Sequence, residues 1–384
     1  MEINIDKSNW SKVNFGDVAI QMKGTVDRDN TDLRYYVKGE HMNSEDVHIR
    51  EFGELTDEYL GPAFIRYFKE GDILYGSRRT YLKKVAVAHF EGITSNTTFV
   101  INAKENVIDK RLLPFLMLSD KFTEHSIMHS KGSVNPYINW KDLANYEFLL
   151  PPKEQQAELA ELLWAMDAVI EKDLEVLKRL EDYMKLYIED FFIDTNRGLN
   201  KIRLSEIADI NKFSLTNKTS KDYEFSYIDL SSIQPRKLNE LDRIKFENSP
   251  SRARRIIKDK SIIISTVRPY QLCNIYIEKN DQDYIASTGT AVINLKNEIN
   301  PKFLFEQFFT NRYVKFIEDR MTGTNYPAIT AKDLEDFEIY FSIDENLVEN
   351  FITKTEQLNT SKIQLESKLK SSKALQKALI NQIF

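Results

Sequence analysis

The spacing of apolar residues divides the first half of the chain into two kinds of segment. Residues 1–150 contain short apolar runs broken by Gly, Asn and Asp, which predicts mixed strands and helices. From Lys153 to Arg197 there is neither Gly nor Pro, and apolar residues recur mostly every three or four positions. That pattern predicts one long amphipathic helix over 151–197, with Pro151 and Pro152 at its start. Some 40 residues would make a rod of roughly 60 Å, which is too long for the interior of one small domain.

The second half of the chain repeats this design. Residues 198–343 have the broken pattern of the first segment, and residues 344–384 again contain neither Gly nor Pro. Because only a short linker separates the first long helix from the second broken segment, the second helix should run back and pack antiparallel to the first. The sequence therefore predicts an α+β fold class, with two repeated mixed α/β domains separated by two long antiparallel coiled-coil helices in a pseudo-twofold arrangement.

The repeat is also visible residue by residue, at a separation of about 190 positions. The matching segments are 79–81 with 268–270, 95–102 with 287–294, and 131–143 with 322–334. The last pair keeps its Gly, Pro, Ile and Lys-Asp-Leu in register. A repeat of this length indicates two copies of one globular domain. A chain built in this way is suited to binding two similar partners or sites at the same time.

Length and composition indicate the number of domains and the cellular compartment of the chain. A length of 384 residues suits two domains, each of which can bury its own core. The single cysteine, Cys273, excludes an internal disulfide and a cysteine-ligated zinc site, which agrees with a reducing compartment. No apolar run is long enough to span a bilayer, and the first residues lack the features of a signal peptide. We expect a cytoplasmic protein with no membrane association.

The net charge of −6 is unusual for a nucleic-acid binder, yet the basic residues are clustered and can neutralise phosphates locally. Arginine can also contact guanine edges, tyrosine can stack, and glycine-containing loops allow close approach. The candidate DNA-contacting residues are Arg78, Arg79, Tyr81, Lys131, Ser133, Asn135, Arg252, Arg254, Arg255, Arg268, Tyr270, Thr322, Thr324 and Asn325. The alternatives are solvated loops, salt bridges to nearby carboxylates, or turns that only position the following helix.

The chain lacks the sequence signatures of an adenine methyltransferase and of a nucleotide-binding phosphate loop. A Gly-rich loop for a methyl donor, an Asn/Asp-Pro-Pro-aromatic signature and a nucleotide phosphate loop are all missing. Asn135-Pro136-Tyr137 comes nearest, but its repeat counterpart keeps only the proline, which favours a turn. His125 and His129 have the spacing of metal ligands on a helix, yet their counterparts are Phe316 and Arg320, which favours packing or phosphate contact. We predict no catalytic residue and no metal site.

The chain contains three motifs that together resemble those of the specificity subunits of type I restriction-modification systems, and the resemblance covers essentially the whole chain. The motifs are Lys141-Asp142-Leu143, then Leu150-Pro151-Pro152-Lys153-Glu154-Gln155-Gln156 at the start of the first long helix, and Gly71-Asp72-Ile73-Leu74 followed by Arg78-Arg79 and Lys84-Val85-Ala86. The second junction, Ser342-Ile343-Asp344-Glu345-Asn346, departs from the family pattern because it lacks the paired prolines and the glutamine.

The resemblance implies a non-catalytic reader of double-stranded DNA. Residues 1–150 and 198–343 would be two target recognition domains, each reading one half of a bipartite target, while the conserved helices 151–197 and 344–384 set the spacing. Two methyltransferase subunits, which would bind S-adenosylmethionine, and a restriction and translocase subunit would be partners. No cofactor is expected in this chain itself.

Two further expectations concern the surfaces of the helices and the loops. Gln155, Gln156 and Glu158 are candidate partner-binding residues on the first helix, although a charged helix face is often only solvated. The two copies differ most in loops such as 25–32 and 213–220, which predicts an asymmetric target. The alternative function is a structural adaptor whose coiled helices join two protein-binding domains.

Overall fold

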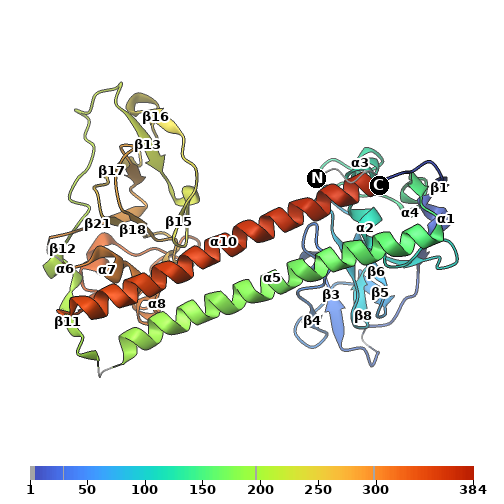
Figure 1. The fold of residues 1–384 in the computed structure, drawn as a ribbon, viewed down its shortest axis with the longest axis horizontal. Helices are drawn as coiled ribbons and strands as arrows, with labels where there is room; N and C mark the ends of the chain where they lie inside the picture. Colours follow the sequence, from blue (N-terminus) through green and yellow to red (C-terminus); the bar gives the residue numbers. More distant parts are fainter. Residues whose placement is uncertain (1–4, 29, 195–196, 297–298) are drawn as a thin grey trace. The chain divides into compact units, whose positions relative to one another are not determined.

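The computed structural model describes residues 5–28, 30–194, 197–296 and 299–384. The chain divides into two compact units, one made of Met1–Glu175 with Glu366–Phe384, and the other of Val176–Leu365. Each unit holds one globular domain and part of both long helices, α5 (Lys153–Ile193) and α10 (Glu345–Ile383) (Figure 1). We call the globular parts the first domain, before α5, and the second domain, between α5 and α10.

The first domain contains β1 to β10 and four short α-helices. Its strands are β1 (Ser11–Asn14), β2 (Ala19–Met22), β3 (Tyr35–Val37), β4 (Gly53–Glu54), β5 (Phe64–Phe68), β6 (Ile73–Gly76), β7 (Val85–Val87), β8 (Gly92–Ser95), β9 (Thr98–Ala103) and β10 (Glu147–Leu150). Its helices are α1 (Phe15–Val18), α2 (Leu113–Leu118), α3 (Asp120–Met128) and α4 (Trp140–Ala144), with 3₁₀ turns η1 (Gly39–His41) and η2 (Thr80–Leu82).

The second domain contains β11 to β22. Its strands are β11 (Asn200–Arg203), β12 (Ala208–Ile210), β13 (Glu224–Ile228), β14 (Ile233–Gln234), β15 (Lys237–Leu238), β16 (Arg243–Lys245), β17 (Ala253–Ile256), β18 (Ser261–Ser265), β19 (Ile275–Ile277), β20 (Ile285–Ser287), β21 (Thr290–Leu295) and β22 (Glu338–Phe341). Its helices are α6 (Leu204–Ile207), α7 (Pro301–Gln307), α8 (Asn311–Glu318) and α9 (Ala331–Glu335), with 3₁₀ turns η4 (Leu230–Ser232), η5 (Phe246–Asn248) and η6 (Pro269–Gln271).

The two domains share the topology of their four-stranded sheets, as the repeat predicted, and the second domain adds the pair β14-β15. The first domain has sheets of order β2-β9-β6-β7 and β4-β3-β8-β5, and the second has β12-β21-β18-β19 and β16-β13-β20-β17. In each domain one strand pair is parallel, β3 with β8 and β13 with β20. Even the bulge recurs, between Phe64 and Arg66 in β5 and between Ala253 and Arg255 in β17. The predicted mixed α/β repeat is therefore confirmed.

The central strands explain why the chain folds locally as sheet. Thr98, Phe99, Val100 and Ile101 of β9 are all buried, and the whole of β18 is buried. Strands that are covered on both faces read as continuous apolar runs rather than as alternating patterns. These runs in the sequence are the middle strands of the sheets.

The long helices confirm the predicted amphipathic segments and their antiparallel packing in each unit. In the first unit Gln376 donates to the Leu163 carbonyl (3.4 Å) and Lys368 pairs with Asp173 (2.8 Å), so numbers fall along α10 as they rise along α5. In the second unit Lys362 pairs with Glu181 (2.7 Å). Residues 195–196 of the predicted segment 151–197, and residue 29 of the loop 25–32, lie outside the described residues.

The ends of the long helices complete the core of each unit. Leu379, Ile380 and Ile383 of α10 belong to the main core cluster of the first unit. In the second unit Phe191 and Phe192 of α5 pack on Phe303 of α7. Each buried side chain of this size stabilises the contact by about 1.5–3 kcal/mol, so a few of them hold a helix end firmly on a domain. None of the described helices is apolar enough over a sufficient length to cross a membrane.

Candidate nucleic-acid interface

Two loops that the sequence analysis singled out in the first domain lie in contact with each other. The N–H of Arg79, just after β6, donates a hydrogen bond to the Pro136 carbonyl (2.7 Å). The backbones of Arg78 and Tyr137 form an antiparallel β-bridge, and the Ile138 N–H donates to the Ser77 carbonyl (2.9 Å). Segments 77–79 and 136–138 therefore form one continuous piece of surface.

The second domain repeats this arrangement with different side chains. The N–H of Arg268 donates to the Pro327 carbonyl (2.7 Å), and Val267 forms a bridge with Ala328. The proline that recurs in the sequence thus supplies the carbonyl that holds the recurring arginine. The structure brings together the two candidate loops of each domain, although they lie more than fifty residues apart in the chain.

The arginines themselves adopt an unusual backbone conformation. Arg79 and Arg268 both have φ of 49°, in the left-handed region. Each is followed by a short 3₁₀ turn that ends at a second left-handed residue, Lys83 (φ 47°) or Leu272 (φ 50°). A side chain in this region costs roughly 1–2 kcal/mol, which glycine would avoid. The two domains therefore share a strained arginine at the same place.

The second loop of each pair is a tight hairpin. Lys131 and Tyr137 exchange backbone hydrogen bonds (2.8 and 2.9 Å), as do Thr322 and Ala328 (3.0 and 2.9 Å). Gly132 and Gly323 have φ of +90° and +93°, values that side chains rarely adopt. The glycines of the repeat motif are therefore required by this turn.

Most of the candidate side chains on these loops are exposed. The exposed ones are Arg78, Arg79, Tyr81, Ser133, Arg268, Tyr270, Thr322, Thr324 and Asn325, whereas Asn135 is half-buried. The Arg268 guanidinium lies 5.0 Å from the ring centre of exposed Tyr326, a cation–π arrangement. Lys131 is exposed and pairs with Asp142 (3.4 Å), so its charge is partly engaged.

The arginine cluster around β17 is more engaged than its sequence suggests. Arg254 donates to the Ala253 carbonyl (2.7 Å) and lies over the Phe246 ring (5.1 Å). Arg255 donates to Ser214 (3.2 Å) and is half-buried. Arg252 is exposed, and within the described parts of the chain its side chain forms no hydrogen bond or ion pair. Of the three, Arg252 has the most exposed side chain, since Arg254 and Arg255 are half-buried.

The structure gives several other charged residues internal roles. Lys83 is buried and forms ion pairs with Asp120 and with Glu45 (3.3 Å), so it does not belong to an exposed basic patch. The hydrogen bond from Lys83 holds the pKa of the Asp120 carboxyl below its usual value. His125 bonds to the Asp142 carbonyl (2.8 Å) and packs against His129, with ring centres 4.1 Å apart. Across the described residues, no group of three or more potential ligands could hold a metal ion.

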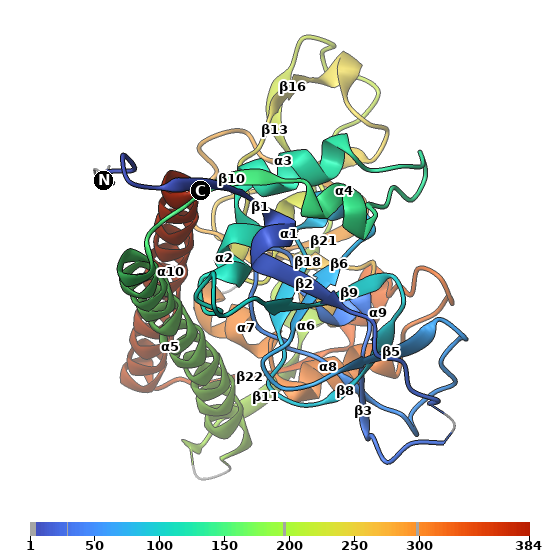
Figure 2. The same ribbon diagram turned by 90° about the vertical axis from the view of Figure 1, so that its right-hand side faces the viewer.

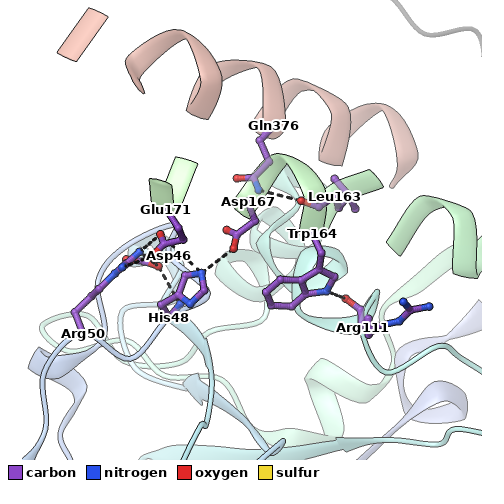
Figure 3. Close-up of polar contacts among 9 residues, drawn as sticks. All are labelled: Asp46, His48, Arg50, Arg111, Leu163, Trp164, Asp167, Glu171 and Gln376. Atoms are coloured by element: carbon purple, nitrogen blue, oxygen red, sulfur yellow. Dashed lines mark hydrogen bonds and ion pairs between the residues drawn. The ribbon is translucent and has the colours of Figure 1, made fainter. Parts of the chain in front are cut away.

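A polar cluster joins the first domain to α5 within the first unit (Figure 3). His48 bonds to Asp167 (2.7 Å), and Arg50 bonds to both oxygens of Glu171, one at 2.6 Å. The hydrogen bond to Asp167 raises the pKa of His48, and the hydrogen bond from Arg50 lowers the pKa of Glu171. Because His48 and Asp167 lie 119 residues apart, no sequence spacing announces their contact.

Trp164 adds a second attachment between α5 and the first domain. Its indole N–H donates to the Arg111 carbonyl (2.9 Å; Figure 3). Its ring packs against Phe115, with ring centres 5.1 Å apart. The helix is therefore fixed to the domain by apolar, hydrogen-bonded and ionic contacts together.

Residues 7–181 match the family model described as the type I restriction modification DNA specificity domain. This segment, a little under half of the chain, is therefore similar to type I restriction-modification specificity proteins. The specificity subunit of the type I restriction enzyme EcoDI of Escherichia coli is 30% identical over 173 residues, which cover 44% of this chain and 37% of that subunit. The chain thus spans well under two thirds of the length of this curated relative.

Solved structures from this specificity family have the same fold. One, described as the structural basis of complex assembly and conformational transition of the type I R-M system, aligns over 97% of both chains with a TM-score of 0.60 at 18% identity. A type I specificity subunit from M. genitalium aligns over 98% of this chain and 96% of that chain, with a TM-score of 0.57 at 16% identity. The fold of two mixed domains and two long helices is therefore that of the specificity family.

The three candidate partner-binding residues at the start of α5, Gln155, Gln156 and Glu158, differ in their exposure to solvent. The Gln156 side chain is 1% exposed, accepts from the Asp109 N–H (2.7 Å) and donates to the carbonyls of Val107 and Pro151. Gln155 accepts from the Trp10 indole (2.8 Å). Glu158 is exposed. The two glutamines therefore tie the start of α5 to the first domain.

Two features were missed by sequence reasoning. One is a cleft beside Arg78, to which Gln21, Asn96 and Asn139 contribute. Comparison of the two repeats would have singled out these amide residues, because the second copy lacks them. The other is a row of exposed apolar side chains at every seventh position of α5: Leu162, Val169, Val176 and Tyr183. Seven residues make nearly two helical turns, so this spacing was visible in the sequence.

Proposed function

We propose that this chain is the DNA sequence-specificity subunit of a type I restriction-modification complex. Residues 1–150 and 198–343 act as two target recognition domains, and each reads one half of a bipartite, asymmetric target. Residues 151–197 and 344–384 form the helices that set the distance between the half-sites. The chain is non-catalytic, and methylation and cleavage take place in partner subunits.

The observation that carries this proposal is the pair of loops built around a left-handed arginine in each domain. Each domain presents one such arginine with exposed tyrosine and hydroxyl or amide side chains around it. Arginine suits guanine edges and phosphates, and Asn, Ser and Thr suit base edges. Two modest readers on one chain combine into a specific one, because binding of the first raises the effective concentration of the second. The two loop pairs carry different side chains, which supports an asymmetric target.

The proposed partners are two methyltransferase subunits, which bind S-adenosylmethionine, and a restriction and translocase subunit. The exposed row on α5 is the surface that we assign to methyltransferase docking. Its four side chains are 41–53% exposed, which is uncommon for apolar groups recurring on one side of a helix. Exposed Glu158 lies on the same helix and adds a charge for the partner.

The decisive experiment is to co-express the chain with the methyltransferase encoded next to it and to map methylated adenines across the host genome. We expect a split motif with two different halves and a fixed gap. Two inverted copies of one half would contradict the asymmetric target. No new methylation from a stable complex would contradict the proposed function and would favour a structural adaptor.

Docking on α5 has a matched test. Val169 and Ala168 are adjacent and both exposed, yet they lie about 100° apart around the helix. Val169→Asp should abolish co-purification of the methyltransferase, whereas Ala168→Asp introduces the same charge and should retain it. Equal retention by both variants would exclude this row as the docking surface.

A further inference from the structure

The cleft beside Arg78 in the first domain has a volume of about 260 Å³. Its amide and guanidinium groups come from Gln21 on β2, Arg78 after β6, Asn96 between β8 and β9, and Asn139 before α4. Ser77, Thr97 and aromatic rings such as Trp140 complete the lining. The strands β2 and β9 and the helix α4 that surround it are labelled in Figure 2. The cleft adjoins the paired loops of the proposed DNA surface.

The hydroxyls of Ser77 and Thr97 in the cleft bond within the chain, whereas its amide and guanidinium groups are largely free of such bonds. Among the described residues, the side chains of Gln21, Arg78 and Asn96 form no hydrogen bond and no ion pair with the rest of the chain. Asn139 makes one long hydrogen bond, to Asp142 (3.4 Å). Each amide offers donors and an acceptor, and the guanidinium offers several donors. The cleft therefore displays both kinds of hydrogen-bonding group to whatever enters it.

The second domain provides an internal comparison. Gln21 lies opposite Ile101 in its sheet, and Ile210 lies opposite Ile293 in the same place of the second domain. Arg78 forms a backbone β-bridge with Tyr137, and Val267 forms the equivalent β-bridge with Ala328. By the same correspondence, Thr288 replaces Asn96 and Thr330 replaces Asn139. Four amide or guanidinium side chains thus become two apolar residues and two threonines, so this chemistry belongs to the first domain alone.

The occupant can be argued from size and chemistry. Small-molecule and cofactor pockets enclose roughly 300–1,000 Å³, so this open cleft is small for a complete cofactor. It carries a single cationic side chain, whereas a phosphate site would be expected to use several positive groups or a helix N-terminus. Asn and Gln pair with N6 and N7 of adenine, and Arg pairs with O6 and N7 of guanine. These are the major-groove edges of the two purines.

We propose that this cleft reads purine edges in the half-site bound by the first domain, with Gln21, Arg78 and Asn96 as specificity-determining residues. The inference rests on the proposed DNA-reading function. The second domain, which has Ile210, Val267 and Thr288 in these places, reads its half-site by other contacts.

The test uses the full chain in complex with the methyltransferase encoded next to it. Methylated motifs are mapped for the parent and for Gln21→Ala, Asn96→Ala and Asn96→Asp, and binding to target duplexes with single base-pair changes is measured. Each alanine variant should lose about 5- to 150-fold of discrimination at one purine position, in one half-site only. Asn96→Asp should shift preference at its position towards cytosine, because a carboxylate accepts from the cytosine amino group.

The controls separate the possible failures. Thr288→Ala, the counterpart of Asn96→Ala, must leave that half-site unchanged, and Arg268→Ala must act on the other half. Asn96 is exposed, so its variants should fold even if Gln21→Ala does not. An unchanged motif with both Asn96 variants, from a parent that methylates a split motif, overturns the cleft proposal alone. A parent complex that methylates no split motif overturns the proposed function, and the cleft proposal with it.

Discussion

The side-chain oxygen of Asn381, near the end of α10, accepts a hydrogen bond from the backbone N–H of Asp120 at the start of α3 (2.8 Å). The Asn381 amide also donates to the Asp120 carboxylate (2.6 Å). In the second unit the N–H of Asn311, at the start of α8, bonds to Glu189 of α5. In each unit, therefore, the end of a long helix supplies a hydrogen-bond acceptor to the first turn of a short helix in the globular domain, where backbone N–H groups lack partners.

We predict that Asn381→Ala lowers the stability of the first unit by roughly 1–2 kcal/mol, the usual effect of losing a capping acceptor and a bond to a carboxylate. All three tryptophans, Trp10, Trp140 and Trp164, belong to this unit, so their fluorescence during urea unfolding reports on it. Lys370→Ala, at an exposed position of α10, is the control and should leave the midpoint unchanged. Equal midpoints for parent and Asn381→Ala would contradict the role of the cap.

The stability of the first unit should depend on pH through His48. Hydrogen bonding to Asp167 raises the pKa of His48 in the folded state, and Glu171 lies 3.8 Å away. This contribution is fully present below the unfolded pKa of about 6.5 and is lost as the pH rises through the folded pKa. Arg50, which also faces the cluster, remains charged across this range. We expect a lower urea midpoint at pH of about 8 than at about 6, by tryptophan fluorescence.

The His48→Gln variant should remove most of that pH dependence. His89→Gln, at an exposed histidine of the same unit, is the matched control and should retain it. If His48→Gln has the same slope of stability against pH as the parent, the salt bridge to Asp167 does not hold the helix.

Replacing Arg79 should separate DNA binding from stability. At φ of 49° a glycine is free of the steric strain that arginine and alanine share. Arg79→Gly should therefore be at least as stable as Arg79→Ala, while both bind the target duplex more weakly by about 1–3 kcal/mol. Thermal unfolding and duplex titration of the methyltransferase complex measure the two quantities. Unchanged affinity in both variants would remove Arg79 from the DNA surface.

Binding to DNA should be strongly salt-dependent despite the net charge of −6, because phosphate contacts release counterions. Arg252→Ala should reduce the slope of log affinity against log salt by about 1 and leave the methylated motif unchanged. Arg254→Ala is a useful comparison, since that guanidinium already bonds to Ala253 and lies over Phe246. A larger change of slope for Arg254 than for Arg252 would reverse this assignment.

The fold was largely predictable because its signals are local. A helix repeats every 3.6 residues, so the apolar stripe from Leu159 to Phe191 indicates α5 without knowledge of its neighbours. The repeat around Pro136 and Pro327 likewise indicates two equivalent domains. The bounds of the helices follow within a few residues, since Pro and Gly stop helical patterns wherever the rest of the chain lies.

The roles of individual side chains were less predictable, because burial and pairing depend on distant residues. Gln156 looks like a surface residue at the start of a helix, but Asp109, Val107 and Pro151 enclose its amide. Lys83 looks like part of a basic patch, but Asp120 neutralises it inside the first unit. A sequence gives the charge of a residue and not its partner.

The sequence alone determined the two-domain repeat, the two long helices and the kinds of side chain available for contacting DNA, because these depend on composition and short-range spacing. The tertiary structure decided that Arg79 meets Pro136, that Gln21, Arg78 and Asn96 line one cleft, and that His48 reaches Asp167. Those contacts join residues from roughly twenty to more than a hundred positions apart. They form only when packing of the core fixes the distance between strands and helices, and no local pattern encodes that distance.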